Sequence, residues 1–155
     1  MSVVHRFYTA LREHDWRVMN TCYHADARFH DPVFGDLDVH GVRAMWELLL
    51  ARGTDLQLSY QVEHEDGQGA VVAWEARYTF TRTGRKVVNK ARTVMTVRDG
   101  LIAEQEDAFD RWRWARQALG LPGLLLGWSP AFWKKVRTQL RLALGRQGEF
   151  TYGVP

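Results

Sequence analysis

Two aspartates are placed to move protons, because each lies on the apolar face of a predicted strand. Asp31 ends a short strand predicted over 27–31 and shares a face with Phe29. Alternation along a second strand, predicted over 101–109, places Asp107 on the face that also carries Ala103, Gln105 and Phe109. A carboxylate that turns into an apolar interior loses hydration, so its pKa rises toward the range useful to a general base or acid.

Each aspartate also has an interpretation that needs no chemistry. Asp31 precedes Pro32, and aspartate before proline commonly forms an Asx-turn. Asp107 belongs to the acidic stretch 104–110, which is typical of a solvated strand edge. If both aspartates instead face one cavity, they cannot both ionise easily, so one keeps its proton and acts as the acid.

A further set of side chains is predicted to bind a flat, apolar ligand. It comprises Tyr8, Trp16, Tyr23, Trp46, Trp74, Tyr78, Asn89, Thr93, Gln105 and Phe109. The aromatic members either stack on the ring system of a ligand or pack in the core. Asn89 and Thr93 lie on the apolar face of their predicted strand, where a polar side chain needs a partner from the ligand or from buried water.

Metal and cofactor chemistry finds no support in the residue pattern. The six histidines show no spacing typical of metal ligands. The single cysteine, Cys22, lies near apolar residues of a predicted helix and is more typical of a core residue than of a nucleophile. No glycine-rich phosphate loop is present. We therefore expect chemistry without a metal or other cofactor.

The N-terminal half of the chain predicts the elements that must position Asp31. A helix is expected over 3–13, and a second short helix, capped by Asp15, carries Trp16, Met19 and Tyr23 on one face. A third helix is expected over 42–52. The segments expected as a turn and a loop are 24–26 and 35–41.

The C-terminal half begins with period-two alternation, which predicts four strands over 56–62, 72–80, 87–97 and 101–109. Asp110 then caps a helix that Gly120 and Pro122 break, and Ser129-Pro130 opens a last helix. Consecutive strands of this kind indicate an α+β fold, with a strongly bent antiparallel or mixed sheet whose concave side is closed by the helices.

Composition limits the class of protein. The chain has 155 residues, of which 46% are hydrophobic and 12% aromatic, enough for the core of one domain. One cysteine excludes an internal disulfide framework, and no secretion signal opens the chain, so a cytoplasmic location is expected. Residues 1–110 carry 13 Lys/Arg and 17 Asp/Glu, whereas residues 111–155 carry 8 and 1. No groove-reading motif accompanies this basic end, so nucleic acid is not an expected partner.

Several local motifs together resemble the SnoaL-like branch of the nuclear transport factor 2-like superfamily. They are Phe7-Tyr8-Thr-Ala-Leu11 before Asp15, Ala27-Arg-Phe29-His-Asp31-Pro32-Val33, Gly41 at a helix start, and Arg98-Asp-Gly100-Leu-Ile102 before Glu104-Gln-Glu-Asp107. The resemblance covers roughly residues 3–118 and implies a cone-shaped domain around one apolar pocket. This superfamily includes polyketide cyclases, ketosteroid isomerase and limonene epoxide hydrolase.

The resemblance implies roles for both aspartates and also exposes departures. Asp31 matches the base of ketosteroid isomerase, and Asp107 matches the acid/base of polyketide cyclases. Gln105 stands where the cyclases often have a histidine. The tyrosine of the isomerase oxyanion hole matches Phe7, with Tyr8 one residue off, and its protonated aspartate falls near Arg92 or Thr93. The Arg-x-Asp pair of limonene epoxide hydrolase is missing from the predicted strands.

Beyond the resemblance lies a basic segment. We expect a cone domain over 1–118, a basic amphipathic helical extension over 119–145 and a flexible tail over 146–155. The apolar stripe of the extension includes Trp128, Phe132 and Trp133, while Lys134, Lys135, Arg137, Arg141 and Arg146 lie largely off it. Such a helix closes the cone as a lid or contacts a second subunit of a homodimer, and less plausibly rests on an anionic membrane.

The sequence is therefore consistent with three functions. The first is a cofactor-independent enzyme of isomerase, cyclase or dehydratase type, acting by acid/base chemistry on a small apolar carbonyl or polycyclic compound. The second is a non-catalytic protein that binds an apolar small molecule. The third, weaker reading is a peripheral membrane protein that acts through its C-terminal helix.

Overall fold

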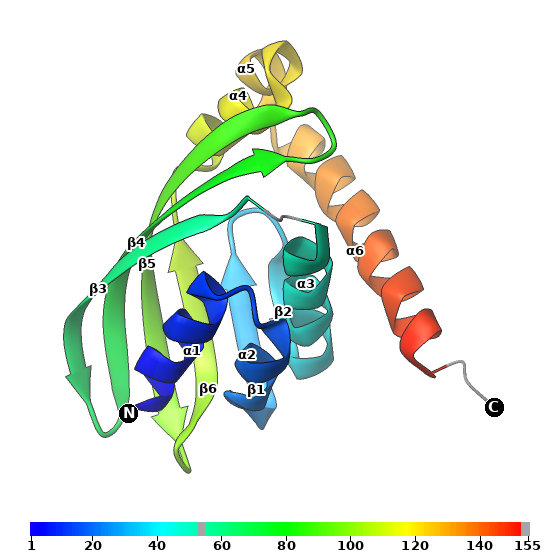
Figure 1. Cartoon of the computed structure of the whole chain (residues 1–155). Coiled ribbons are helices and arrows are strands. Elements are labelled where there is room, and N and C mark those ends of the chain that lie inside the picture. The colour runs from blue at the N-terminus through cyan, green and yellow to red at the C-terminus, as the bar shows by residue number, and fades with distance from the viewer. Residues whose placement is uncertain (53–54, 153–155) are drawn as a thin grey trace.

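Six strands form one curled, unclosed sheet, shown in the computed structural model of Figure 1, which describes residues 1–52 and 55–152. For residues 146–152 only the backbone is described. The strands are β1 (Tyr23–Asp31), β2 (Gly35–Asp38), β3 (Gln57–Asp66), β4 (Gly69–Phe80), β5 (Arg85–Arg98) and β6 (Leu101–Ala108). Their order is β2-β1-β6-β5-β4-β3, and the only parallel neighbours among them are β1 and β6. The sheet is therefore mixed.

Helices cover the concave side of this sheet and one end of it (Figure 1). They are α1 (Val3–Arg12), α2 (Trp16–Thr21), α3 (Val39–Arg52), α4 (Arg111–Leu119), α5 (Leu121–Leu126) and α6 (Pro130–Tyr152). α1, α2 and α3 lie within the curl of the sheet, α4 and α5 lie at the end where the β4–β5 hairpin turns, and α6 runs from there along α3 (Figure 1). The resulting α+β cone confirms the expected fold class.

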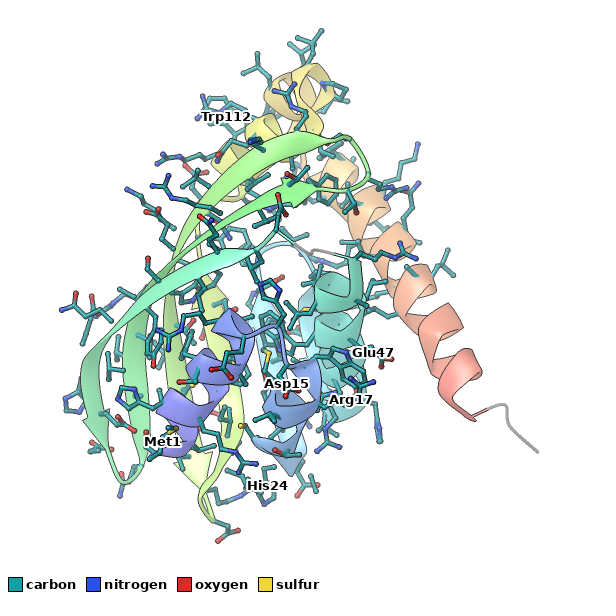
Figure 2. The ribbon with its side chains drawn as sticks, in the orientation of Figure 1. Met1, Asp15, Arg17, His24, Glu47 and Trp112 are labelled. Carbon is teal, nitrogen blue, oxygen red and sulfur yellow. The ribbon has the colours of Figure 1, made fainter. Side chains whose placement is uncertain are left out.

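Side-chain caps begin three helices where the sequence places a hydroxyl or a carboxylate. Ser2 accepts a hydrogen bond from the amide of His5 at α1. Asp15 accepts from the amide of Val18 at 3.0 Å and begins α2 (Figure 2). Asp110 caps α4 in the same way. These bonds satisfy amides that have no partner within the helix, so the predicted starts of α2 and α4 are confirmed.

Two predicted connections are wrong. The expected turn at 24–26 lies inside β1, and Tyr23 begins that strand instead of joining the face of α2. The register between β1 and β6 shifts between Tyr23 and Arg28, so a bulge absorbs the turn-forming residues without ending the strand. The expected loop at 35–41 instead contains β2 and the first residues of α3.

The C-terminal segment contains one more helix than expected. α4 ends at Leu119 as predicted, and Gly120 adopts a φ of 67°, which favours glycine. Pro122 then lies in the first turn of a new helix, α5, where its missing N–H costs nothing. α6 continues to Tyr152, past the expected end at residue 145. The side chains of the expected tail, 146–155, lie outside the described residues.

Among the helices that the structure describes, none is long and apolar enough to cross a membrane.

Candidate functional site

The parallel ladder between β1 and β6 brings the two aspartates together. Phe29 pairs with Gln105 and His30 with Glu106, so the next position along both strands places Asp31 beside Asp107. Neighbouring strands lie about 4.8 Å apart, and residues in register on them point to the same face of the sheet. Both aspartates are buried, with exposed fractions of 8% and 5%. The sequence-based expectation that they form a carboxylate pair in the interior thus has a structural basis.

Asp31 is buried and also forms an Asx-turn, so the expected burial and the expected turn occur in the same residue. Its Oδ1 accepts hydrogen bonds from the backbone amides of Val33, at 2.8 Å, and Phe34. Burial raises the pKa of Asp31 to about 6, although these amide donors and the nearby His30 lower it in part. The turn fixes the direction of the carboxylate, and burial keeps its proton affinity near that of a useful base.

Asp107 is held by side chains instead of backbone amides. Its Oδ1 accepts from the hydroxyl of Thr93 at 2.7 Å and from the amide Nε2 of Gln105 at 3.1 Å. Burial raises the pKa of Asp107 to about 7, those two donors lower it in part, and the charge of Asp31 raises it. The interpretation of Asp107 as a solvated edge residue is wrong, because Asp107 is buried while the other carboxylates of the stretch, Glu104, Glu106 and Asp110, are exposed.

A chain of hydrogen bonds fixes the orientation of the Gln105 amide. The indole Nε1 of Trp46 donates to the hydroxyl of Tyr23 at 2.9 Å, and that hydroxyl donates to Oε1 of Gln105 at 2.6 Å. Nε2 of Gln105 therefore faces Asp107 as a donor. Because Oδ1 of Asp107 already accepts two hydrogen bonds, the proton of the neutral acid belongs on Oδ2. The neutral side chain then has one O–H donor to offer.

Thr93 and Tyr8 complete this polar cluster. The indole Nε1 of Trp74 donates a hydrogen bond to the Thr93 hydroxyl at 2.8 Å. The Thr93 O–H in turn donates its hydrogen bond to Asp107. The buried Tyr8 hydroxyl has no hydrogen-bond partner among the described residues, although Asp107 and Thr93 lie close enough to influence its pKa. Burial raises the pKa of Tyr8, so its O–H is retained. The Tyr8 ring stacks on Tyr60 at a centroid distance of 4.9 Å.

Tyr8, and not Phe7, lies near Asp107, although spacing in the sequence matched Phe7 to the oxyanion-hole tyrosine. Phe7 matched the oxyanion-hole tyrosine by its distance to Asp15, but Phe7 packs edge-on against Tyr23 and Trp46 in the core. Tyr8 is the residue of α1 that approaches Asp107. The resemblance placed the protonated aspartate of the isomerase near Arg92 or Thr93. Arg92 lies on the exposed face of β5 and pairs with Glu63, and the acid near Tyr8 is Asp107.

Tyr78 connects the site to the C-terminal helices. Its hydroxyl accepts a hydrogen bond from the indole Nε1 of Trp114 at 2.8 Å. Burial raises the pKa of Tyr78, and the charge of Asp31 raises it further, so the two side chains lie near each other. Trp114 in turn contacts Phe80 and Trp133. α4 and α6 therefore form a wall of the region around Asp31.

Five of the ten predicted binding residues have no hydrogen bond to this cluster within the described part of the chain: Tyr8 and Tyr78, described above, and Trp16, Asn89 and Phe109. Trp16 is partly buried and lies under the guanidinium of Arg17 at 4.4 Å. Asn89 is buried on the same face of β5 as Thr93, four pairs along the ladder with β4. Phe109 packs against the core just past the end of β6. The binding role of all ten residues stays a prediction.

Sequence reasoning missed three aromatic residues near the site. Tyr60 lies on the inward face of β3, which the alternation of Leu58, Tyr60 and Val62 already indicated. Trp114 lies on α4, at the end of the segment expected to form the cone, and Trp133 lies on α6, in the expected extension. Helical spacing predicts that they are buried, but it does not predict that they reach the sheet near Tyr78.

Two clefts of the described structure lie away from the buried aspartates. A cleft of 610 Å³ is lined by Arg85, Lys86, Arg113, Arg116 and Gln117, and one of 360 Å³ by residues of α4 and α6. Neither of these two clefts includes Asp31 or Asp107. Searching residues 1–52 and 55–152 for three or more grouped His, Cys, Asp or Glu side chains that could hold a metal ion gives none. The enclosed pocket between the carboxylates stays a prediction.

A cone-shaped sheet with helices in its curl is the fold of nuclear transport factor 2-like domains. The chain belongs to the family of SnoaL-like domains, which matches residues 4–105. It is similar to IdmH, a proposed polyketide cyclase from Streptomyces antibioticus, with 22% identity, a TM-score of 0.63 and coverage of 77% of this chain and 96% of IdmH.

Two further solved structures share the fold. A protein from Catenulispora acidiphila with a ketosteroid isomerase-like fold, crystallised with trimethylamine, has 15% identity and a TM-score of 0.67 over 83% of this chain and 97% of its own. TerC, co-crystallised with polyporic acid, has 22% identity and a TM-score of 0.59 over 70% and 88%. No curated protein matches the chain. At these identities the structures establish the fold alone.

Proposed function

We propose that this protein is a cofactor-independent enzyme that acts by acid–base chemistry on a small, apolar carbonyl compound. The observation that carries the proposal is the pair of buried aspartates on adjacent strands, whose pKa values rise to about 6 and about 7. Near neutral pH Asp31 is then mostly ionised, while Asp107 still holds a proton in about half of the molecules. One carboxylate is ready to accept a proton while the other can donate one.

The chemistry we assign is enolisation. The carboxylate of Asp31 removes a proton from the carbon next to the substrate carbonyl, and the electron pair of that C–H bond moves to the carbonyl oxygen. The O–H groups of Tyr8 and neutral Asp107 donate hydrogen bonds to this oxygen as it gains charge. Where the enolate is conjugated with a C=C bond, return of the proton from Asp31 to the far carbon of that conjugated system shifts the double bond and gives an isomer, and no redox partner is needed. Such acid–base assistance contributes roughly 10²–10⁴-fold in rate.

The substrate class follows from the lining of the cluster. Tyr8, Tyr60, Trp74 and Tyr78 offer flat apolar faces near the two carboxylates, and these faces suit a ring system. TerC, a structure of the same fold, was crystallised with polyporic acid. We therefore assign an aromatic or polycyclic carbonyl compound as the class of substrate.

The C-terminal extension fits the role of a lid over this site. Trp114 reaches Tyr78, and Trp133 packs against Trp114 from α6. Arg137 of α6 lies against Gly35, directly after the turn that holds Asp31. Movement of α4 and α6 would open the region around Asp31 to a ligand. The expected homodimer is a separate prediction, which size-exclusion chromatography with light scattering tests.

A second candidate function is binding without turnover. The specific observation in its favour is Gln105, which stands where cyclases of this family often have a histidine and which holds Asp107 by an amide that does not transfer protons. In that function the aspartates are structural and the aromatic residues hold an apolar ligand.

A ligand screen separates the two functions. We would measure thermal shifts and native mass spectra with flat ketones, steroids and aromatic polyketides, using wild type, Asp31→Asn and the exposed control Asp36→Asn. An enzyme converts a bound compound in wild type and in the control, whereas Asp31→Asn binds it unchanged. Equal binding by all three proteins, with no conversion of any compound that binds, supports the carrier and contradicts the enzyme.

A further inference from the structure

α5 has its apolar residues on the outside. Gly123 is the residue that this helix buries, and a Cβ atom added there would overlap the carbonyl oxygen of Ala115 in α4. Only glycine permits so close an approach of two helices. The remaining large side chains of α5 and its flanks are exposed, with fractions of 66% for Leu121, 44% for Leu124, 58% for Leu125, 49% for Leu126 and 72% for Trp128. A helix that packs on its own domain normally shows the reverse pattern.

These side chains form one patch with Trp112 of α4. The indole Nε1 of Trp112 donates to the carbonyl oxygen of Leu124 at 3.3 Å, and that of Trp128 donates to Leu125 at 2.8 Å. Trp112, itself 39% exposed, lies at the end of the molecule that is far from α1 (Figure 2). We call Trp112, Leu121, Leu124, Leu125, Leu126 and Trp128 the leucine patch. Contiguous exposed apolar patches of this kind mark contact with a protein or a membrane.

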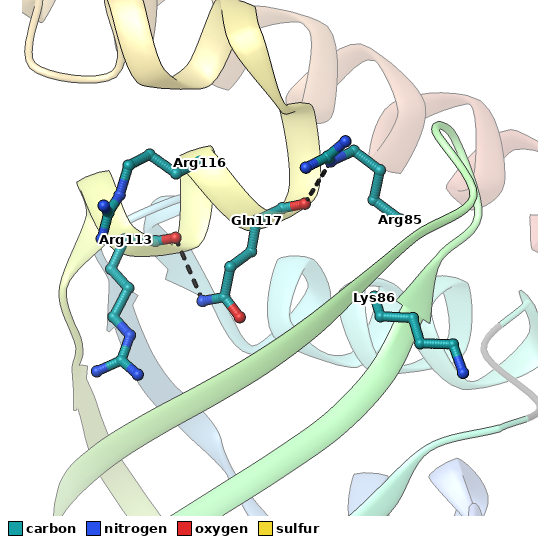
Figure 3. Close-up of a pocket in the computed structure, with 5 residues that line it drawn as sticks. All are labelled: Arg85, Lys86, Arg113, Arg116 and Gln117. Carbon is teal, nitrogen blue, oxygen red and sulfur yellow. Dashed lines mark hydrogen bonds between the residues drawn. The ribbon is translucent and has the colours of Figure 1, made fainter.

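Positive charge borders the leucine patch. The guanidinium of Arg116 stacks on Trp112 at 4.1 Å, and Arg85 lies against Gly120 at the start of α5. With Lys86 and Arg113 these side chains line the cleft of 610 Å³ shown in Figure 3. Among the described residues, the ion pairs of lysine and arginine involve Arg77, Lys90, Arg92 and Arg98 instead. None of the four cations of the cleft belongs to these ion pairs, and of the four only Lys86 is recorded near a carboxylate, the exposed Asp55, whose pKa it helps to lower.

We propose that the α4–α5 end of the molecule docks on an anionic membrane surface. The leucine patch enters the boundary between headgroups and acyl chains, where tryptophan is also favoured. Arg85, Lys86, Arg113 and Arg116 contact the phosphates of the headgroups. Charge decides between a membrane and a second copy of this chain, since a second copy brings the same uncompensated cations to the interface. The sequence-based membrane hypothesis placed this contact on the last helix, but Trp133 of that helix is buried.

Vesicle flotation tests this proposal with the full chain. Vesicles of phosphatidylcholine alone are compared with a roughly 2:1 mixture of phosphatidylcholine and phosphatidylglycerol, and we expect at least roughly tenfold stronger binding to the mixture. Leu124→Ser with Leu125→Ser should weaken binding to the mixture about tenfold or more. Arg113→Gln with Arg116→Gln should reduce the preference for anionic vesicles roughly tenfold and flatten its salt dependence.

Matched controls remove one exposed apolar side chain or two exposed charges elsewhere. Val94→Ser, on the outer face of β5, and Arg12→Gln with Arg28→Gln, in α1 and β1, should bind as wild type does. Circular dichroism confirms that each variant is folded. No binding by wild type, equal binding to both kinds of vesicle, or equal loss in the controls overturns the proposal. So does a dimer in solution that Leu124→Ser with Leu125→Ser dissociates, because the patch would then be a subunit interface.

Discussion

The C-terminal ends of β1 and β6 each bury one aspartate, but they hold it with different donors. At the end of β1, backbone amides of a turn point at Asp31 and stabilise its charged form. In β6, Asp107 relies on Thr93 and Gln105 and lies next to the charge of Asp31. Two carboxylates of the same type therefore differ in pKa in the order that a base and an acid require. Burial raises both pKa values, donors lower both in part, and the charge of Asp31 raises that of Asp107 further. Under the proposed function this order makes Asp31 the base and Asp107 the acid.

Substitution of either carboxyl group should separate the two roles most strongly. We expect Asp31→Asn to lower turnover of a converted substrate by about 10³-fold, because the other buried carboxyl group, Asp107, serves as the proton donor in the proposed step. Asp107→Asn should lower it less, by about 10²-fold, because the amide still donates a hydrogen bond to the carbonyl oxygen. Steady-state kcat measures both effects, with Asp36→Asn as the control. A larger loss for Asp107→Asn than for Asp31→Asn would reverse the assignment.

The pH dependence of turnover should have two limbs. Activity falls below about pH 6 as Asp31 gains a proton, and it falls above about pH 7 as Asp107 loses one. In Asp107→Asn the alkaline limb should disappear while the acidic limb stays. A profile of kcat/KM against pH measures this, and an unchanged alkaline limb in that variant contradicts the role of Asp107.

Stability should also depend on the two aspartates, with a sign that follows from their raised pKa values. Between about pH 4 and pH 7 the folded state binds more protons than the unfolded state, so the free energy of unfolding falls as pH rises. The pKa of Asp107 is raised more than that of Asp31, so Asp107→Asn removes the larger part of this pH-dependent decrease in the free energy of unfolding. The variant should therefore be more stable than wild type near pH 8, by on the order of 2 kcal/mol. Near pH 4 the two proteins should be equally stable. Urea unfolding of both proteins at both pH values measures this difference. If Asp107→Asn is not more stable than wild type near pH 8, the raised pKa of Asp107 is contradicted.

Thr93→Val should affect Asp107 without affecting Asp31. The substitution removes the hydroxyl that donates to Asp107 and accepts from Trp74, so we expect a loss of about 1–3 kcal/mol in the free energy of unfolding. The pKa of Asp107 should rise further, since a donor to its charged form is lost. A carboxyl titration in which the pKa of Asp31 moves instead would show that Thr93 serves the other aspartate.

Two tyrosines give the smallest and most selective test. Tyr23→Phe breaks hydrogen bonds to Trp46 and Gln105 and should cost about 1–2 kcal/mol of stability. Tyr8→Phe removes a hydroxyl that has no partner in the described part of the chain, so its effect on stability should be within about 0.5 kcal/mol. Ligand affinity should show the reverse order. Equal stability losses would mean that the Tyr8 hydroxyl is used within the folded protein.

Part of this site could be predicted from local pattern. Alternation along β6 correctly turned Asp107 and Gln105 inward, and the strand that ends at Pro32 correctly buried Asp31 with Phe29. Both predictions hold because side-chain direction in a strand depends only on position along it. Capping residues predicted the starts of α2 and α4 for a similarly local reason.

The rest depends on contacts between distant segments. The parallel pairing of β1 with β6 joins residues far apart in the chain, and no local pattern encodes its register. That pairing also draws residues 24–26 into β1, although their types favour a turn. The outward face of α5 depends on the approach of Gly123 to α4, which becomes visible only when both helices are placed. Sequence reasoning therefore failed at the features that depend on packing between distant segments.

A carboxyl-carbon NMR titration of aspartate-labelled protein tests the central claim most directly. The account predicts two aspartate signals that titrate near pH 6 and pH 7, each absent from its own Asn variant. In Asp31→Asn the remaining signal, from Asp107, should titrate at lower pH because its negative neighbour is gone. If every aspartate titrates near its ordinary value of about 4, the two carboxylates are ordinary acids and the acid–base assignment is wrong.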